Sequence, residues 1–314
     1  MTQSLLLRIS VAAISSFVLF AAIFTLPFAA LPMAYIGLAY GLGPAVMVAG
    51  LAVVLTSVLL SPPLAIVFAI VFLLPSFAVV RQALLSRAVP APQGPKFVFY
   101  PLQSLILMTL AITAVGTIIG FMALGGQPGL PQSLASALSS SPEISGALAQ
   151  VYQVSSPEDY LHLANIMLVT SFASWPLLVL GNAQIAQAIL VRQGKNLRPA
   201  TDYATLTLPP WLALGLAGFL ALALGLTGWL ATLFAALAAL AMGAYFLLGL
   251  AVIHANSRNW NGRGLLLATL YFLLFVMAWV SIPVSLMGLL DARFDFRGLK
   301  KHPDKPSDLP GDKE

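Results

Sequence analysis

The sequence contains no cysteine among its 314 residues. Disulfides, thiolate nucleophiles, iron–sulfur clusters and cysteine-ligated zinc are therefore excluded. Its three histidines, His162, His254 and His302, lie far apart and show no metal-ligand spacing. We therefore expect neither a metal site nor a bound cofactor.

Charged residues are also scarce. They make up 8% of the chain, whereas hydrophobic residues make up 60%; a soluble domain has about 25% and about 45–50%. Backbone in lipid must satisfy its own hydrogen bonds, and the alternating polar and apolar pattern of a membrane β-barrel is missing. The sequence therefore predicts an all-α, polytopic transmembrane helical bundle of eight to nine hydrophobic helices in a lipid bilayer. Five stretches contain no Asp, Glu, Lys or Arg: residues 9–80, 97–142, 160–191, 203–257 and 264–290.

The chain also lacks the motifs of the common membrane-associated enzymes. It has no HExxH, no Gly-x-Ser-x-Gly, no paired aspartates in a span and no P-loop. No carboxylate lies inside a hydrophobic stretch, which argues against a proton-driven carrier. The net charge of +5 comes from short loops and a tail rather than from a folded face, so nucleic-acid binding is not expected. We therefore expect a protein that is not an enzyme.

The apolar stretches indicate one integral membrane domain over residues 1–290, followed by a charged, largely disordered C-terminal tail, 291–314. Prolines and glycines divide residues 9–80 into helices, one of which is a short piece at 33–43. Residues 125–160 form the one sizeable hydrophilic loop before the tail, and we expect short amphipathic helices there, on the outer membrane surface. The last hydrophobic helix is predicted over 264–290, with a kink near Pro283.

Basic residues indicate the orientation. They gather in the loops 81–96, 192–198 and 258–263, whereas the 125–160 loop carries acidic residues only. The positive-inside rule then places the three basic loops in the cytoplasm of a bacterial cytoplasmic (inner) membrane. Arg8 lies on the same side only if 9–80 contains four helices. The tail holds six Lys/Arg but would fall outside, so its side stays open.

The stretch 156–198 combines a helix start, an apolar span and a basic end. It also carries polar side chains at membrane depth: Asn165, Asn182, Gln184 and Gln187. One interpretation is a polar lining of a pocket or path for a small molecule. The alternative is hydrogen bonding between helices, or proximity to the membrane interface. Gln184 and Gln187 are three residues apart and should share a face.

The segment after the last span provides a second candidate. Four charged residues alternate there, at Asp291, Arg293, Asp295 and Arg297. They are candidates for docking another membrane protein or for a local ion-pair network; the alternative is a solvated segment at the membrane surface.

Several segments resemble a known family. These are residues 32–37 (PMAYIG), 40–44 (YGLGP), 190–199 (LVRQGKNLRP), 249–254 (GLAVIH) and 288–297 (GLLDARFDFR). Together they resemble the YybS-like bacterial membrane proteins, a family of unknown function. The N-terminal half of that family is similar in layout to the substrate-binding S components of energy-coupling-factor vitamin transporters, which implies a bundle with a ligand pocket. The resemblance carries over no binding residue.

Two functions fit these observations. The first is a substrate-binding or transport-related membrane protein, S-component-like, that takes a small-molecule ligand. The alternative is a non-transporting scaffold or assembly factor that acts on other membrane proteins through the 125–160 loop and the C-terminal segment.

Overall fold

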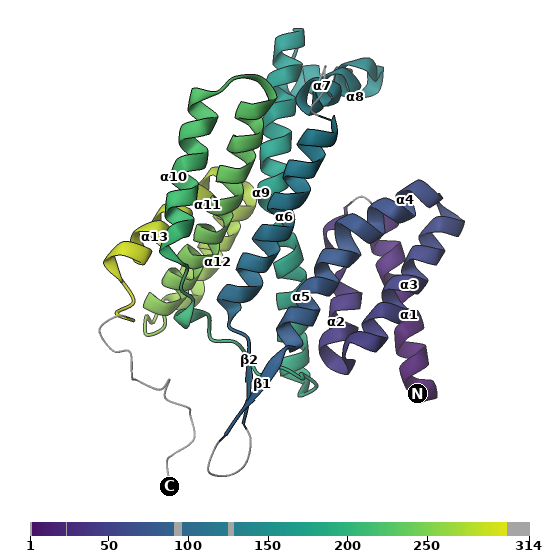
Figure 1. The fold of residues 1–314 in the computed structure, drawn as a ribbon, viewed down its shortest axis with the longest axis vertical. Coiled ribbons are helices and arrows are strands. Elements are labelled where there is room, and N and C mark those ends of the chain that lie inside the picture. Colours follow the sequence, from purple (N-terminus) through teal and green to yellow (C-terminus); the bar gives the residue numbers. More distant parts are fainter. Residues whose placement is uncertain (1, 23, 91–95, 125–128, 300–314) are drawn as a thin grey trace. The chain divides into compact units, whose positions relative to one another are not determined.

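The computed structural model describes residues 2–22, 24–90, 96–124 and 129–299, and within them the chain is almost entirely helical (Figure 1). The chain folds into two compact units, which we describe separately. Unit 1 comprises Met1–Thr201 and Gly218–Leu240; unit 2 comprises Asp202–Ala217 and Ala241–Glu314. The prediction of a single membrane domain over 1–290 stays a prediction. The predicted disorder of 300–314 lies outside the described residues.

Six helices in the described chain are long and apolar enough to cross a membrane, and three further apolar helices are shorter. This confirms the predicted all-α membrane fold with eight to nine hydrophobic helices. The long ones are α1 (Gln3–Ala21), α3 (Leu42–Leu59), the Pro62–Leu84 segment, α6 (Leu102–Leu124), α9 (Pro157–Gln193) and α11 (Gly228–Asn256).

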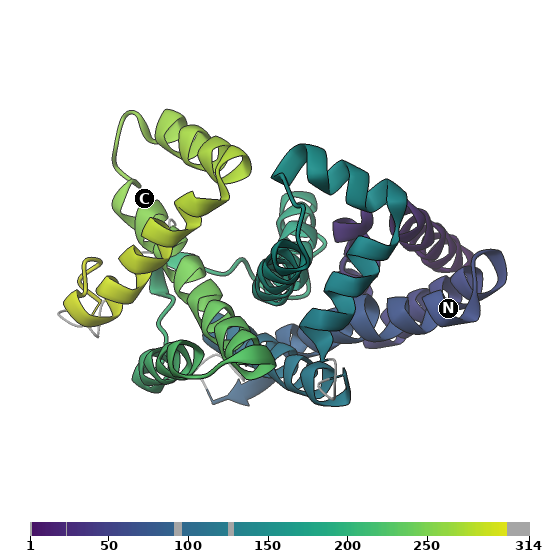
Figure 2. The same ribbon diagram turned by 90° about the horizontal axis from the view of Figure 1, so that it is seen from above.

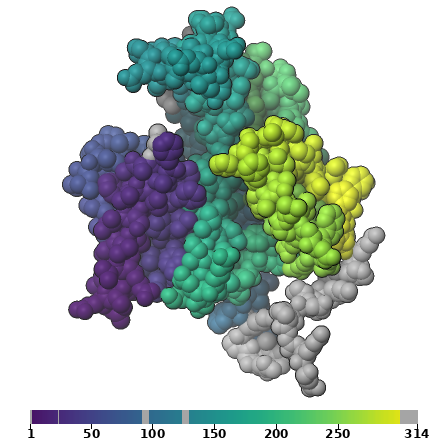
Figure 3. All heavy atoms as spheres, turned by 180° about the vertical axis from the view of Figure 1, so that it is seen from behind, coloured from purple at the N-terminus to yellow at the C-terminus, as the bar shows by residue number. Residues whose placement is uncertain are grey.

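Helix α1 shows why this fold belongs in lipid. Its inner face is buried through Ile9, the alanines and Ser16, whereas its outer face carries an apolar stripe at three- and four-residue spacing. That stripe is 52% to 66% exposed: Leu7, Val11, Ile14 and Val18. The N-terminal region that contains α1 is coloured purple in Figure 3. Hydrocarbon chains can cover such a stripe without the penalty that water would impose.

A short helix, α2, follows α1 and runs back toward the start of α1. The chain turns through η1 (Leu26–Phe28) and enters α2 (Leu31–Tyr40), which has only ten residues. Gly41 ends α2 with a φ of 91°, a conformation open mainly to glycine. The Arg8 guanidinium donates to the Tyr40 hydroxyl, so the start of α1 and the end of α2 lie at the same end of unit 1. The predicted 33–43 piece is therefore a separate helix.

The return pass after α3 contains a local irregularity. Helix α4 (Pro62–Val67) continues into the π-helical segment η2 (Phe68–Leu73) and then into α5 (Leu74–Leu84). Pro75 lacks an N–H and its ring crowds the preceding turn; the wider π turn, in which Leu74 N–H donates to the Ala69 carbonyl, accommodates it. Phe68 and Phe72 of η2 thereby meet Phe20 of α1, at ring-centroid distances of 4.2 and 5.8 Å.

An antiparallel hairpin connects α5 to α6, where the sequence indicated only a loop. Strands β1 (Ser86–Val89) and β2 (Lys96–Phe99) pair from Ser86 with Phe99 to Val89 with Lys96. Each strand is four residues long, too short for a period-2 pattern to stand out from the surrounding apolar sequence.

Helix α9 is 37 residues long, or about 55 Å at 1.5 Å per residue, well beyond the roughly 30 Å hydrocarbon core. Ser156 and Asp159 form a capping box at its start, as the sequence suggested. Two short helices, α7 (Leu130–Ser140) and α8 (Pro142–Tyr152), precede it within the 125–160 loop, where the sequence indicated one or two. Seen from above, they form an angle beside α9 (Figure 2). Ala135 and Leu138 of α7 pack on Ala164 of α9.

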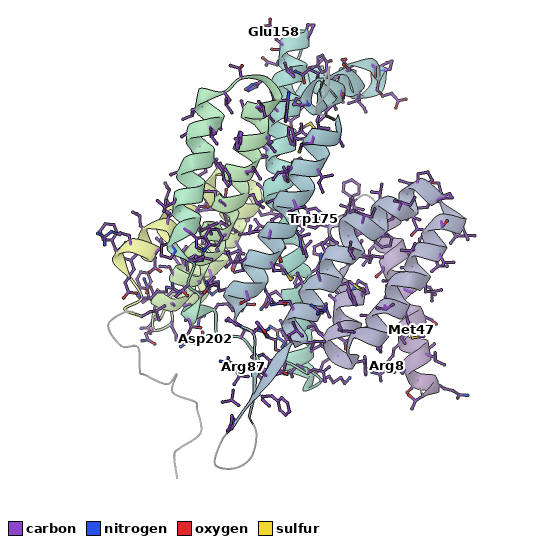
Figure 4. All side chains as sticks on the ribbon, viewed as in Figure 1. Arg8, Met47, Arg87, Glu158, Trp175 and Asp202 are labelled. Carbon is purple, nitrogen blue, oxygen red and sulfur yellow. The ribbon has the colours of Figure 1, made fainter. Side chains whose placement is uncertain are left out.

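The ends of unit 1 differ in charge. Glu158, at the start of α9, lies at the end opposite Arg8 and Arg87 (Figure 4). Arg198 bonds to carbonyls of α5 and of the stretch after the hairpin, so the 192–198 loop is also at the Arg87 end. This arrangement agrees with four helical passes in 9–80 and with Arg8 on the predicted cytoplasmic side.

Unit 2 is built on close contact between two helices. It contains η3 (Tyr203–Thr205), the start of α10 (Pro210–Gly225), most of α11, α12 (Arg263–Val276), η4 (Ala278–Val280) and α13 (Ser281–Phe294). A Cβ on Gly249 of α11 would lie 1.9 Å from the Val284 carbonyl oxygen, and one on Gly288 of α13 would lie 2.1 Å from that of Tyr245. Only glycine permits this approach, as in close-packed membrane helices.

The last predicted helix, 264–290, is wrong in two details. The break falls at Met277 and η4 rather than at Pro283, because a proline in the first turn of α13 needs no intrahelical N–H partner. The helix also continues to Phe294, four residues past its predicted end at Leu290.

Candidate functional site inside unit 1

The four polar residues predicted on α9 do not gather at one place. Asn182 and Gln187 are buried, at 5% and 7% exposure, whereas Gln184 faces outward. Asn165 is half-buried near the other end of α9, where its Oδ1 accepts a 2.8 Å hydrogen bond from the Thr232 hydroxyl. The seventeen residues between Asn165 and Asn182 correspond to about 25 Å of helix. Asn165 and its partner are therefore a separate interhelical contact.

Gln187 stabilises the end of unit 1 that contains Arg87 and the 192–198 loop. Its Nε2 donates to the Arg198 carbonyl at 2.6 Å, and the Arg198 guanidinium donates to the carbonyls of Ala83 and Tyr100 at 3.0 and 2.9 Å. Nearby, the Tyr35 hydroxyl donates to Gln193 Oε1 at 2.7 Å. These bonds hold the loop after α9 against α2, α5 and the chain that follows the hairpin. Gln187 therefore connects α9 to the loop that follows it.

Asn182 has a different environment. Its Nδ2 donates to the Pro27 carbonyl of η1 at 2.8 Å, while its Oδ1, in the described chain, is buried without a hydrogen-bond partner. The amide orientation follows from this bond, since a flipped group would set Oδ1 against the Pro27 oxygen. A buried acceptor without a partner costs about 1–3 kcal/mol. Asn182 thus holds a free acceptor next to a break in the helices.

Helix α2 follows η1 directly, through Ala29 and Ala30, which both have helical backbone angles. Ala34 is the first residue of α2 whose N–H donates along the helix, to the Ala30 carbonyl at 3.0 Å. The amides of Leu31 and Met33 precede it and have no intrahelical acceptor, and Pro32 has no N–H. The positive end of a helix dipole therefore points toward η1, close to Asn182.

Two buried hydroxyls flank the first turn of α2. Arg8 of α1 bonds to Tyr40 at the end of α2, so these two residues lie at the same height in unit 1. Ser16 is eight residues after Arg8 on α1, and Pro32 is eight residues before Tyr40 on α2. Eight residues of helix span about 12 Å, so Ser16 and Pro32 also lie at the same height. On the other side, Gly37 of α2 packs on Val80, and Ser76 lies one turn before Val80, level with Met33. Ser16 and Ser76 are 0% and 1% exposed.

Both hydroxyl oxygens belong to the few buried polar atoms that have no hydrogen-bond partner within the described residues. Together with Asn182 Oδ1, they are buried polar atoms without a partner on three helices that each pack on α2: α1, α5 and α9. We call Ser16, Ser76, Asn182 and the Leu31 and Met33 amides the α2 cluster.

The surroundings of the α2 cluster are apolar and aromatic. Phe20 is one turn beyond Ser16 on α1, and Phe72 is one turn before Ser76 on the neighbouring pass, so both rings lie near the level of η1. The stretches 9–80 and 160–191, which supply these residues, contain no charged side chain. Among the described residues, no group of three or more His, Cys, Asp or Glu is placed to hold a metal ion. The cluster therefore offers hydrogen bonds in an uncharged setting.

Sequence reasoning identified Asn182 but missed the rest of the cluster. Single serines at Ser16 and Ser76 carry no signal, because a serine hydroxyl in a membrane helix ordinarily bonds to the carbonyl one turn earlier. The importance of the η1 turn became visible only once the short helix α2 was placed beside α1, α5 and α9.

The C-terminal candidates are arranged as an internal network. Arg297 donates to Asp291 Oδ2 through Nε and Nη2, at 3.0 and 2.8 Å, and to the carbonyls of Ala204 and Leu206, each at 2.7 Å. The two side chains are only 4% and 3% exposed. Arg293 is exposed on α13, and Asp295 caps the following turn by accepting from Leu299 N–H at 2.9 Å. Asp291 and Arg297 thus bind each other and fasten α13 to the η3 segment.

Comparison with known proteins identifies the family of the chain. No curated protein and no solved structure matches the sequence significantly. The model of one protein family, described as a predicted membrane protein (DUF2232), matches residues 6–292. This range includes α1 from Leu6 onward, the α2 cluster and the glycine contacts of α11 with α13. The protein therefore belongs to the DUF2232 family of predicted membrane proteins.

Proposed function

We propose that the protein is a membrane-embedded binding protein for a small polar molecule, related to transport, with its site at the α2 cluster. The observation that carries this proposal is Asn182, which is 5% exposed and keeps an unpartnered Oδ1 beside the N-terminus of α2. Interrupted helices whose termini face the middle of the bilayer are typical of substrate sites in secondary transporters. Ser16 lies about 12 Å along α1 from Arg8, close to half the thickness of a core of about 30 Å, which supports a site near the middle of the bilayer.

The resemblance to the YybS-like proteins and, in layout, to S components supports the same proposal for unit 1. Because the sequence has no P-loop, energy for transport would come from a partner protein. A bacterial cytoplasmic membrane would fit the basic loops at the Arg87 end of unit 1.

Thermal unfolding of the purified protein in detergent tests this function. A ligand that binds only the folded state stabilises it by about 2.7 kcal/mol at one hundred times its Kd, so a broad metabolite and vitamin panel should contain compounds that raise the melting temperature. The shift should be lost in Asn182→Leu and kept in Gln184→Leu, an outward-facing amide on the same helix. A panel without any shift would exclude the function.

The scaffold function remains the second candidate because of α8. No residue of this helix is buried, and Ile144, Val151 and Tyr152 are 45%, 70% and 63% exposed. Such a face suits a partner protein or the membrane surface. We propose that a scaffold would act through α7 and α8. Stable co-purification of one protein, lost on deletion of 130–152, would favour it, whereas recovery of the protein as a free monomer would count against it.

A further inference from the structure

Helices α12 and α13 are short and are joined by the break at Met277 and η4. Each has 14 residues, which is about 21 Å of helix. Apolar stretches of about 10–14 residues are more typical of re-entrant or interfacial segments than of helices that cross a core of about 30 Å. We propose that α12, η4 and α13 form a re-entrant hairpin that lies in one leaflet, on the side of the basic loops, and that the C-terminal tail lies on that same side.

The end of the hairpin is fixed by Arg297. Its guanidinium donates to the carbonyls of Ala204 and Leu206, which belong to the connection between α9 and α10. The only helix within residues 199–209, η3, has three residues, and extended backbone is not tolerated in lipid, so the chain does not cross a bilayer there. Ala204 and Leu206 are therefore on the same side as the basic loop 192–198, and Arg297 lies there with them.

Contacts with α11 keep the hairpin in one half of the membrane. Helix α11 ends at Asn256, next to the basic loop 258–263 from which α12 begins. The Tyr271 hydroxyl of α12 forms a 2.9 Å hydrogen bond with His254 Nε2, only two residues from that end. Gly288 of α13 packs on the Tyr245 carbonyl, about 16 Å along α11 from Asn256. Even this deeper contact lies at about half the thickness of a 30 Å core.

The surface of α12 has the character of a lipid-facing surface. No residue of this helix is buried, and Leu265, Phe272 and Phe275 are 76%, 64% and 90% exposed. Water would impose a large cost on so exposed an apolar helix, whereas acyl chains can cover it without that cost. The one charged residue of α12 is Arg263, at its first position, where the headgroup region can solvate the guanidinium. The occupant of this surface is therefore the hydrocarbon of one leaflet.

The hairpin also accounts for the charges of the tail. A helix that crossed the membrane over 264–290 would place the six Lys/Arg of residues 291–314 outside, against the positive-inside rule. The hairpin places them on the side of the basic loops, where the rule expects them. The buried Asp291–Arg297 ion pair then holds the end of α13 at that membrane surface. This inference is independent of the α2 cluster and of any ligand.

Cysteine labelling tests the side of the tail, because the chain has no cysteine of its own. Ser307→Cys in the tail is compared with two exposed positions: Asn259→Cys in the basic loop, and Thr227→Cys between α10 and α11, at the opposite end of α11. In intact cells, Ser307→Cys and Asn259→Cys should resist an impermeant maleimide and react only after permeabilisation, whereas Thr227→Cys should react at once. Reaction of Ser307→Cys under the same conditions as Thr227→Cys would show a crossing helix and overturn the hairpin.

Fluorescence quenching tests the lipid contact. A bimane label on Phe275→Cys, in the full-length protein in nanodiscs, should be quenched more strongly by lipids with brominated acyl chains than by aqueous iodide. The same label on Asn259→Cys should show the reverse order. Stronger quenching of the Phe275→Cys label by iodide would place α12 in water, and insensitivity to both quenchers would show that protein covers it. Either result would overturn the placement of α12 in the leaflet.

Discussion

The Asp291–Arg297 pair permits a quantitative prediction in unit 2. Both side chains are at least 96% buried, and Arg297 makes two contacts to the carboxylate and one to each of two backbone carbonyls. Arg297→Met leaves a buried carboxylate and two carbonyls without their donor, so we expect a loss of about 3–5 kcal/mol in the free energy of unfolding. Asp291→Leu leaves Arg297 its two backbone acceptors and should cost less, about 2–3 kcal/mol.

The double variant separates pairing from packing. Once either partner is gone, removal of the other removes an uncompensated buried charge. The double variant, Asp291→Leu with Arg297→Met, should therefore lose at least about 1 kcal/mol less free energy of unfolding than the two single variants lose together. Equilibrium unfolding in mixed detergent micelles, followed by the fluorescence of the five tryptophans, measures all three. Arg293→Met, an exposed position on α13, is the control and should stay within about 0.5 kcal/mol of wild type. Additive effects, or a control as damaging as Arg297→Met, would refute this account.

Three further predictions concern packing, the basic end and orientation. Gly288→Ala should lower stability by about 1–3 kcal/mol in thermal unfolding, because its Cβ would lie 2.1 Å from a backbone carbonyl oxygen of α11. The control is Gly264→Ala, which has open space around it and should not lower stability. Equal losses in the two variants would contradict the packing argument. Arg198→Met should lower the free energy of unfolding by about 3–5 kcal/mol in the same assay, since one buried and one partly buried carbonyl lose a charged donor. A loss below about 1 kcal/mol would show that the loop is held by other contacts. Because the chain has no cysteine, Glu158→Cys should react with an impermeant maleimide on intact cells and Arg87→Cys only after permeabilisation; the reverse pattern would invert the orientation.

Much of the fold could be predicted because a lipid bilayer permits few backbone structures. Charge-free stretches longer than about 20 residues predict helices, and prolines and glycines indicate where the helices end. The capping pattern at Ser156 predicted the start of α9 correctly. The hairpin and the break at Met277 could not be predicted, because four-residue strands and a bend without proline leave no periodic signal.

The candidate site was predictable only in part, for a geometric reason. Spacing suggested that Gln184 and Gln187 share a face, yet the buried side of α9 is broad enough to include Asn182 and Gln187 while Gln184 stays outside. At the C-terminal segment, sequence showed the alternating charges of Asp291 and Arg297 but not the Ala204 and Leu206 carbonyls, about ninety residues earlier, that bury them.

The length of α9 has a mechanical consequence. Pro176 divides this helix into arms of about 28 and 26 Å, one ending beside α7 and the other at the loop fixed by Arg198. Proline removes one backbone hydrogen bond of the helix, so bending at Pro176 would act as a hinge: the outer arm could tilt while the inner arm stays held by the bonds of Gln187 and Arg198. Asn182, six residues past Pro176 on the inner arm, would then keep its bond to the Pro27 carbonyl.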